Sequence, residues 1–470
     1  MLSTILLLYF FWSDTTLEDV SHYAKTPIKA TAPIEVIVPD DIEISFGGGV
    51  YALLTTEKSD IWYAQDSALI SMMGEFKRFS NTANLAVEEI TKEQYDQVMS
   101  YRSIKANFSY SLDFEGLCEA YHVKWANSYD VVEFLNTLGY SEGSKESMFV
   151  YDGNHKKYYR IFSDNKNSSQ LSQIISHVEN DSYEVYVYYP MDAFLGNESQ
   201  VLIPTALNMS LAKYPYRQEL YVDETEKIQK AAQGFFGESL DFIRKITEGN
   251  GAITYMYGYG KKVLIANIDG TLEYKEEMRG ESYVSQKQFE ALQTALEYIA
   301  YHGQWPTSEG VEVRPYLKNV EPISNSDKET GYTFTFGMQL DGQSILYDQG
   351  EMISVTVLGG QVTYYKRDGV IISQGTNPSV ERELLSPINM LAQSYEIIHE
   401  AALEQGIIPQ GSEKQAYTFE DTAKTIEKVD TGYFVNRGNQ QGAGKMKPAW
   451  IVTVGKKNLY FDLYTNEPLE

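Results

Sequence analysis

Two short strings in the sequence contain the side chains that a serine hydrolase needs, a serine nucleophile and a histidine base. The first is GESL, which contains Ser239, and the second is EIIH, which ends at His399. A serine attacks a carbonyl only when a base lies within hydrogen-bond reach and a strained turn exposes the hydroxyl. The stretch around Ser239 reads as helix instead, and both strings carry Glu where such blocks carry Asp. We therefore expect no catalysis at these two residues.

Phosphate- and metal-binding patterns are incomplete as well. GAGKM (442–446) ends in Met446, where a phosphate loop needs Ser or Thr to hold magnesium, and GYGKKV (258–263) lacks the third glycine of a dinucleotide fingerprint. The six histidines show no HxxxH or HExxH spacing, the single cysteine excludes CxxC, and no DxDxDG calcium loop occurs. The sequence thus predicts neither a cofactor nor a metal site.

The most distinctive string is YIAYHGQWP (298–306), at the end of an expected helix. His302 would complement the negative C-terminal end of the helix dipole, and Gly303 would form the left-handed cap. Pro306 prevents the helix from continuing, so Trp305 is expected to fold back onto the helix and a neighbouring sheet. The alternative is that Trp305 is an aromatic anchor for a binding partner.

An unbroken apolar run near the N-terminus is the candidate contact with a membrane or a partner, through Leu6, Leu7, Leu8, Tyr9, Phe10, Phe11 and Trp12. A helix of twelve residues is about 18 Å long, well short of a hydrocarbon core of about 30 Å. A signal peptide would require a basic residue before the run, but no Lys or Arg precedes it. Asp14 and Glu18 follow it. The aromatic end is typical of a membrane interface. We therefore interpret the run as the outer end of a signal-anchor helix whose inner half precedes Met1. This interpretation is favoured over the alternative, a buried core strand.

The composition indicates which secondary structure to expect and which class of partner is improbable. The chain has 470 residues, enough for two to four domains, with 43% hydrophobic residues and 37 tyrosines, which favour strands. Its formal net charge of −26 repels phosphate backbones and makes a nucleic-acid partner improbable. Cys118 stands alone, so no internal disulfide can form, and we expect it to be a small buried hydrophobe.

Pattern changes along the chain divide the expected α+β fold. The chain repeats a pattern in which a helix is followed by a meander of antiparallel strands. This pattern predicts a multi-domain organisation with antiparallel sheets, each packed by helices on one side. Segment 34–41 reads as a strand, 224–242 and 387–406 read as helices, and Trp450 shares a strand face with Val452 and Val454. The expected parts are a remnant of a transmembrane helix (1–14), a stalk (15–32), an N-terminal domain (33–213), a central domain (214–380) and a C-terminal domain (381–470).

The second half resembles the YycH family, extracytoplasmic regulators of the YycFG (WalRK) two-component system. The resemblance is carried by EYIAYHGQWP, TFTFGMQLDGQSILY and ISVTVLGGQVTYYKR, within residues 285–470. Gln304 stands where the family has a second glycine, and the family's proline is missing after Gly342. The string PAWIVTVGKKNLYFDLYTNEPL is similar to the last strands of YycH, YycI and PepSY-like modules, so the central domain is expected to be YycI-like and the C-terminal domain YycI- or PepSY-like.

This resemblance implies a single-pass protein of the cell membrane whose body is extracytoplasmic and has no enzymatic activity. Family members associate with a YycI-type partner and a sensor histidine kinase of the YycG/WalK type, and they modulate the kinase through transmembrane-helix contacts. The sign of that regulation differs among relatives, so both inhibition and activation stay open. An alternative function is a PepSY-like secreted protease inhibitor or chaperone, or a peptide-binding envelope protein that binds at a sheet edge.

Overall fold

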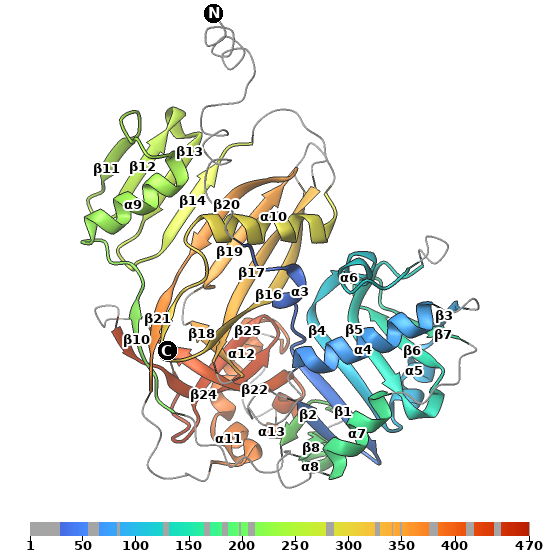
Figure 1. Ribbon diagram of the computed structural model, residues 1–470. Helices are drawn as coiled ribbons and strands as arrows, with labels where there is room; N and C mark the ends of the chain where they lie inside the picture. The colour runs from blue at the N-terminus through green and yellow to red at the C-terminus, as the bar shows by residue number, and fades with distance from the viewer. Residues whose placement is uncertain are drawn as a thin grey trace, which may run out of the picture.

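The computed structural model of the protein contains two large sheets with helices packed against them (Figure 1). The class is α+β with mostly antiparallel pairing, as the sequence predicts. The described residues are 29–54, 65–81, 85–125, 131–163, 170–180, 187–196, 199–204, 212–278, 286–324, 330–340, 342–347, 350–375, 384–409, 418–436 and 443–469.

The first large sheet is formed by the N-terminal part of the chain. Its nine strands are ordered β3-β7-β6-β5-β4-β1-β2-β8-β9. Strand β4 shows why the sheet forms, since Ile104 and Ala106 are buried while Lys105 between them faces the other side. The strands are β1 (Asp41–Gly47), β2 (Val50–Leu54), β3 (Ala86–Ile90), β4 (Ser103–Asp113), β5 (Phe134–Ser141), β6 (Ser147–Asp152), β7 (Lys157–Phe162), β8 (Val187–Pro190) and β9 (Leu202–Pro204).

Helices lie on both faces of this first sheet. Helices α4 (Gln65–Ser80) and α7 (Gln170–Asn180) pack together over β1 and β4. Helix α5 (Lys92–Met99) departs from the one-sided arrangement that the sequence suggests, because its Tyr95 and Met99 contact Phe149 in a separate cluster. The remaining helices of this part are α3 (Pro33–Val36), α6 (Phe114–Ala120), the 3-10 turn η2 (Glu142–Ser144) and α8 (Asp192–Leu195).

The second large sheet has twelve strands and runs through the rest of the molecule. Its order is β11-β12-β13-β14-β20-β19-β17-β18-β22-β24-β25, with β16 paired to β17. The strands are β11 (Arg244–Thr247), β12 (Ile253–Tyr257), β13 (Lys262–Ala266), β14 (Leu272–Glu276), β16 (Val313–Ser324), β17 (Thr330–Leu340), β18 (Gln343–Tyr347), β19 (Ile353–Leu358), β20 (Gln361–Arg367), β22 (Ile426–Val435), β24 (Lys447–Val454) and β25 (Lys457–Asp462).

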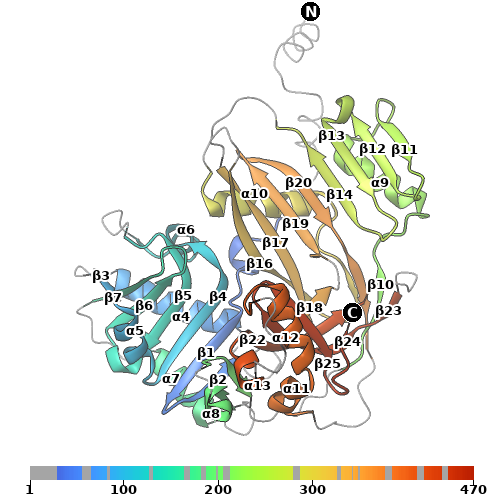
Figure 2. The same cartoon turned by 180° about the vertical axis from the view of Figure 1, so that it is seen from behind.

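Helix α10 (Gln288–Tyr301) joins the two large sheets. It packs on β17, β19 and β20 and also contacts α3 and α6 (Figures 1 and 2). The Gln288 side chain donates to the Ser111 carbonyl (3.0 Å) and accepts from the Asp113 amide (2.8 Å), so both of its polar atoms are satisfied across the junction. The last turn of α10 lies at the other end of the helix, beside the end of β20, where Arg367 donates to the Gln304 carbonyl and where the candidate site lies.

A small sheet holds the chain on the opposite side of that site. It has the order β15-β21-β10-β23, from β15 (Ser308–Glu309), β21 (Val370–Ser373), β10 (Pro215–Gln218) and β23 (Ala443–Lys445). Strand β10 leads into α9 (Thr225–Phe236), and β21 follows β20 after a two-residue turn. The other helices are α11 (Pro387–Gln393), α12 (Tyr395–Glu404) and α13 (Phe419–Ala423), with the 3-10 turn η3 (Gly258–Gly260) between β12 and β13.

Three expected elements differ from the structure. Residues 34–41 are not one strand, because Pro33 begins helix α3 and its fixed φ suits a first helical turn. Helix α9 ends at Phe236 rather than near 242, since Gly237 follows with φ +98°. The expected helix over 387–406 is broken at Ser394 into α11 and α12, and the Ser394 hydroxyl bonds the Asn466 side-chain oxygen (3.3 Å).

The domain limits at 213/214 and 380/381 remain predictions. Among the described residues, two strand pairings cross the second limit, because β18 pairs in parallel with β22 and β10 pairs with β23. The apolar run at Leu6–Trp12 lies outside the described residues. Within the described part of the chain, no helix combines the length and the apolar character needed to cross a membrane.

Candidate functional site

The turn after helix α10 has the geometry of a Schellman cap. The Gln304 amide donates to the Ile299 carbonyl (2.8 Å), and the His302 amide donates to the Tyr298 carbonyl (3.0 Å). Gly303 has φ +116° and Gln304 has φ +59°, so two consecutive residues adopt positive φ. This reversal turns the carbonyls of Gly303 and Gln304 toward the end of β20.

The two singled-out tryptophans lie in different places. The Trp305 indole N–H donates to the Thr31 hydroxyl (2.9 Å), and its ring meets Phe336 of β17 edge-on at 5.4 Å. It is half-buried and packs against the main core. Trp450 lies on β24, fully buried beside Val452. Neither indole lines the pocket described below.

The His302 ring is part of an aromatic stack between α9 and α10. It stacks on Phe235 at 4.4 Å between ring centroids with 12° between the planes, and its centroid lies 4.0 Å from that of Tyr298. Phe235 also stacks on Tyr274 of β14 at 4.7 Å. Such offset aromatic contacts add about 0.5–1.5 kcal/mol to the burial of the rings. The stack fastens α9 to the last turn of α10.

An ion pair between the buried Arg367 and the half-buried Glu219 closes the other side of this junction. The Arg367 guanidinium at the end of β20 donates Nε to Glu219 Oε2 (2.7 Å) and Nη2 to Glu219 Oε1 (2.6 Å). Its Nη1 donates to the Gln304 carbonyl. Burial alone would lower the pKa of Arg367, but Tyr365 and Glu219 raise it above its usual value. The guanidinium therefore stays charged and joins β20, the β10–α9 connection and the α10 cap.

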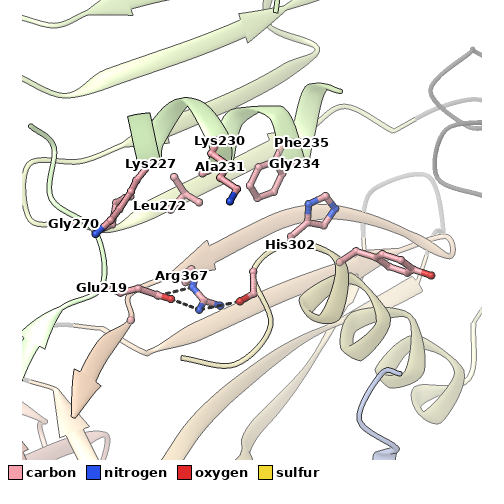
Figure 3. Close-up of a pocket in the computed structure, with 14 residues that line it drawn as sticks. Glu219, Lys227, Lys230, Ala231, Gly234, Phe235, Gly270, Leu272, His302 and Arg367 are labelled. Carbon is pink, nitrogen blue, oxygen red and sulfur yellow. Dashed lines mark hydrogen bonds and ion pairs between the residues drawn. The ribbon is translucent and has the colours of Figure 1, made fainter. Parts of the chain in front are cut away.

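These elements enclose a pocket of about 500 Å³. In Figure 3, α9 presents Lys227, Lys230 and Phe235 from one side, and the Glu219–Arg367 pair lies opposite, with His302 at the end. The lining residues are Glu219, Leu220, Lys227, Lys230, Ala231, Gly234, Phe235, Gly270, Leu272, Tyr301, His302, Gly303, Arg367 and Gly369. This size lies within the range of small-molecule and peptide side-chain sites.

The chemistry of the pocket suits binding. Both Glu219 oxygens are engaged by Arg367, which leaves no carboxylate poised as a base. Lys227 pairs with Glu224 outside the pocket (2.5 Å), whereas Lys230 makes no ion pair with any described residue. The lining contains no Ser, Thr or Cys nucleophile. The pocket therefore offers one unpaired ammonium group beside aromatic and aliphatic walls.

Comparison with known proteins adds a fold relationship over nearly the whole chain. No protein-family profile matches the chain, and a search of curated proteins finds no significant sequence match. The crystal structure of YycH from Bacillus subtilis superposes with a TM-score of 0.55 and 14% identity, covering 93% of this chain and 98% of that chain. The protein has a YycH-like fold. The match confirms the family resemblance at the level of fold and extends it beyond residues 285–470.

The residues that build the pocket in this YycH-like fold were only partly found from the sequence. The string YIAYHGQWP identified His302 and Gly303, but Arg367, Glu219 and Phe235 were missed. One signal was present, since Tyr365 and Arg367 are two positions apart in a strand and so share its inward face. Gly369 fits the same contact, because a Cβ at this position would collide with the Glu219 carboxylate, but that collision depends on the fold and leaves no signal in the sequence.

Ser239 and His399 do not form a catalytic pair in the YycH-like fold. The Ser239 hydroxyl donates to Asp241 (2.8 Å) just beyond α9, and His399 is buried on α12 with Nδ1 3.1 Å from the Thr422 hydroxyl. Helices α9 and α12 are far apart in both views (Figures 1 and 2). Among the described residues, no three His, Cys, Asp or Glu side chains are grouped closely enough to hold a metal. Cys118 is buried, and burial raises the pKa of its thiol.

Two glycines that line the pocket provide a test of the cap. Replacing Gly303 by alanine forces an L-residue to φ +116°, which we expect to cost about 1–3 kcal/mol of stability. Gly234 lies in α9 with open space at its Cβ position, so Gly234→Ala should gain about 0.5–1 kcal/mol. Urea unfolding followed by circular dichroism measures both. Shifts of the two midpoints in the same direction would contradict this description of the cap.

Proposed function

We propose that this protein is a membrane-anchored, non-catalytic regulator of a two-component sensor histidine kinase, with its body on the extracytoplasmic side. The observation that carries the proposal is the YycH-like fold, which covers 93% of the chain. The motif resemblance in residues 285–470 supports it independently, because it depends on the amino-acid sequence alone. The kinase would be of the YycG/WalK type, with a YycI-type protein as a second partner.

The apolar run at Leu6–Trp12 is the segment that we assign to the membrane contact. A two-state kinase shifts only when a partner binds one of its states more tightly. A helix that packs against the kinase's own transmembrane helices supplies such a preference through small differences in packing and hydrogen bonding. The body would then set the position of that helix, and no chemical step is needed.

The proposal is tested in membranes from cells that express the full-length protein and the kinase together. We expect the kinase to co-purify with the tagged protein, and we expect deletion of the gene to change expression from a promoter that the response regulator controls. Absence of co-purification together with unchanged reporter expression contradicts the proposal. Either sign of the reporter change supports it, because the relatives include inhibitors and activators.

A matched pair of variants separates the membrane segment from the body. Exchanging Leu6, Leu7 and Leu8 for Ser should abolish co-purification with the kinase and release the protein from membranes. Ile70→Ser is the control, since Ile70 lies on the exposed side of α4 in the N-terminal domain and is 55% exposed. Loss of co-purification in the control, with membrane association intact, would place the kinase contact on the body instead.

A PepSY-like inhibitor, chaperone or peptide-binding role is the second candidate, and an open sheet edge favours it. Strand β11 ends the twelve-stranded sheet, and within the described chain its only strand partner is β12. An extended peptide can add to such an edge through main-chain hydrogen bonds. A pull-down that is dominated by a secreted protease and lacks the kinase would favour this candidate.

A further inference from the structure

Strand β11 is an open edge of the twelve-stranded sheet, at one extremity of the molecule in both views (Figures 1 and 2). The Glu248 amide donates to the Ala252 carbonyl (2.8 Å), so the backbone of Glu248 faces β12. The backbone polar groups of successive residues in an antiparallel ladder face alternate sides. The N–H and C=O groups of Lys245 and Thr247 therefore face away from β12 and meet no other described strand. We call residues 244–248 the β11 edge.

The sequence of the β11 edge, RKITE, is complementary to itself when two copies run antiparallel about Ile246. In this register Arg244 lies opposite Glu248 of the second copy, and opposite charges on directly opposed residues stabilise a sheet. Lys245 lies opposite Thr247 of the second copy. Both of these residues have outward backbone groups, so each pair exchanges its N–H···O bonds across the contact. The open edge and the order of its charges thus fit the same partner, a second copy of the chain.

Neighbouring registers lack this complementarity. An arrangement centred on Lys245 places two lysines directly opposite each other, and like charges at such positions destabilise a sheet. An arrangement centred on Thr247 places Arg244 opposite the uncharged Asn250. Registers shifted by one residue set outward backbone groups against inward ones, so the ladder cannot form its hydrogen bonds. The sequence therefore selects the register centred on Ile246.

Exposed apolar side chains at the two ends of the β11 edge fit the same arrangement. Phe242, which is 89% exposed, precedes the edge, and Ile268, which is 58% exposed, lies beside the turn that follows it. Ile268 Cγ2 is 3.5 Å from the position that a Cβ on Gly251 would occupy. Antiparallel pairing brings Phe242 of each copy to the 249–251 turn of the other copy, beside Ile268. A second copy thus covers apolar surface at both ends of the ladder.

The surroundings of the β11 edge leave room for this pairing. Helix α9 contacts β13, two strands inside the edge, so with strands about 4.8 Å apart the α9 helices of two copies stay clear of each other. Asp241 and Asp269 lie outside the ladder, and they accept hydrogen bonds from the Ser239 hydroxyl (2.8 Å) and the Thr271 amide (2.9 Å). The formal charge of −26 per chain opposes association at long range, but physiological salt screens charges more than about 8–10 Å apart.

We propose that the β11 edge pairs with a second copy of this chain and joins the two twelve-stranded sheets into one. The contact is isologous, since the same residues face each other across a two-fold axis through Ile246. The ladder is short, so the dimer is weak in dilute solution. Anchoring two copies in one membrane, as under the proposed function, raises their effective concentration. The pairing itself goes beyond that function, because it uses residues 242–251 and Ile268 and requires no kinase.

Disulfide cross-linking of the full chain tests the register directly. Cys118 is buried, so thiols introduced as Arg244→Cys and Glu248→Cys are the accessible ones. The two positions form a non-hydrogen-bonded pair with Cα atoms about 4.5 Å apart, within the range that a disulfide spans. We expect a mixture of the two variants to form a linked dimer on oxidation, whereas each variant alone stays monomeric, because identical positions do not face each other. No dimer in the mixture, or equal cross-linking of either variant alone, overturns the proposal.

Charge reversal gives a second readout, the dimer dissociation constant from sedimentation velocity. Arg244→Glu should raise this constant about tenfold, because it sets two carboxylates against each other at both ends of the ladder. Adding Glu248→Arg exchanges the charges and should restore pairing. Lys124→Glu is the control, since it makes the same change of charge at an exposed residue of the N-terminal part.

Equal weakening by Arg244→Glu and Lys124→Glu, or no rescue in the double variant, contradicts the proposed pairing. Monomers at every concentration also overturn it, and they leave the β11 edge to the extended peptide of the second candidate function. Kinase co-purification is a separate measurement, so its failure leaves these results unaffected.

Discussion

Replacing Glu219 by alanine should destabilise the protein by about 3 kcal/mol, because it leaves the Arg367 guanidinium charged and buried without its partner. The Arg367 side chain is 7% exposed, and two of its three nitrogens donate to Glu219. The third nitrogen, Nη1, donates to the Gln304 carbonyl, which cannot replace the two hydrogen bonds to Glu219. Hydrogen exchange of the β20 and α9 amides in increasing urea measures the loss of stability in these two elements.

Removing both charges tests the cause of that loss. The double variant Glu219→Leu with Arg367→Met replaces both members of the ion pair by apolar side chains and should recover most of the stability lost in Glu219→Ala. Arg217 and Glu309 provide a control, since this exposed pair (3.0 Å) should change stability very little when Glu309 is replaced by alanine. If Glu219→Ala has no larger effect than Glu309→Ala, the Glu219–Arg367 pair does not hold the junction together.

The sequence predicted those parts of the fold that repeat a local pattern. The cap at Gly303 and the strand face that Trp450 shares with Val452 and Val454 both follow from spacing between neighbouring residues. Single residues overrode the pattern elsewhere. Pro33 converted an expected strand into α3, and Gly237 ended α9 early. In each case a backbone preference outweighed the periodicity of the apolar side chains.

The candidate site was less predictable because it depends on contacts between distant segments. Glu219 and Arg367 are separated by 148 positions in the chain, and neither has a local motif. Only the segment 298–306 was distinctive, since a helix end with glycine and proline has a local signature. Phe242 illustrates the same limit, because the exposure of its side chain depends on where α9 ends.

Of the substitutions considered, Trp450→Ala should produce the largest loss of stability, about 3–5 kcal/mol. The indole is 1% exposed on β24, where it pairs with Phe461 of β25 and Thr431 of β22. Its removal leaves a cavity. Strand β24 cannot shift to close this cavity, because β22 and β25 pair with it on both sides and fix its register. Hydrogen exchange of the β22 and β24 amides in increasing urea measures the change.

A conservative variant separates volume from polarity at this position. The Trp450 indole N–H is buried without a hydrogen-bond partner among the described residues, so Trp450→Phe removes an unsatisfied donor as well as part of the ring. We expect Trp450→Phe to cost less than half as much as Trp450→Ala. Trp305→Phe makes the contrast, since it breaks a hydrogen bond to Thr31 and leaves that hydroxyl without its donor. A Trp450→Phe loss as large as that of Trp450→Ala would show that the indole N–H has a partner, and that polarity rather than cavity volume decides the cost.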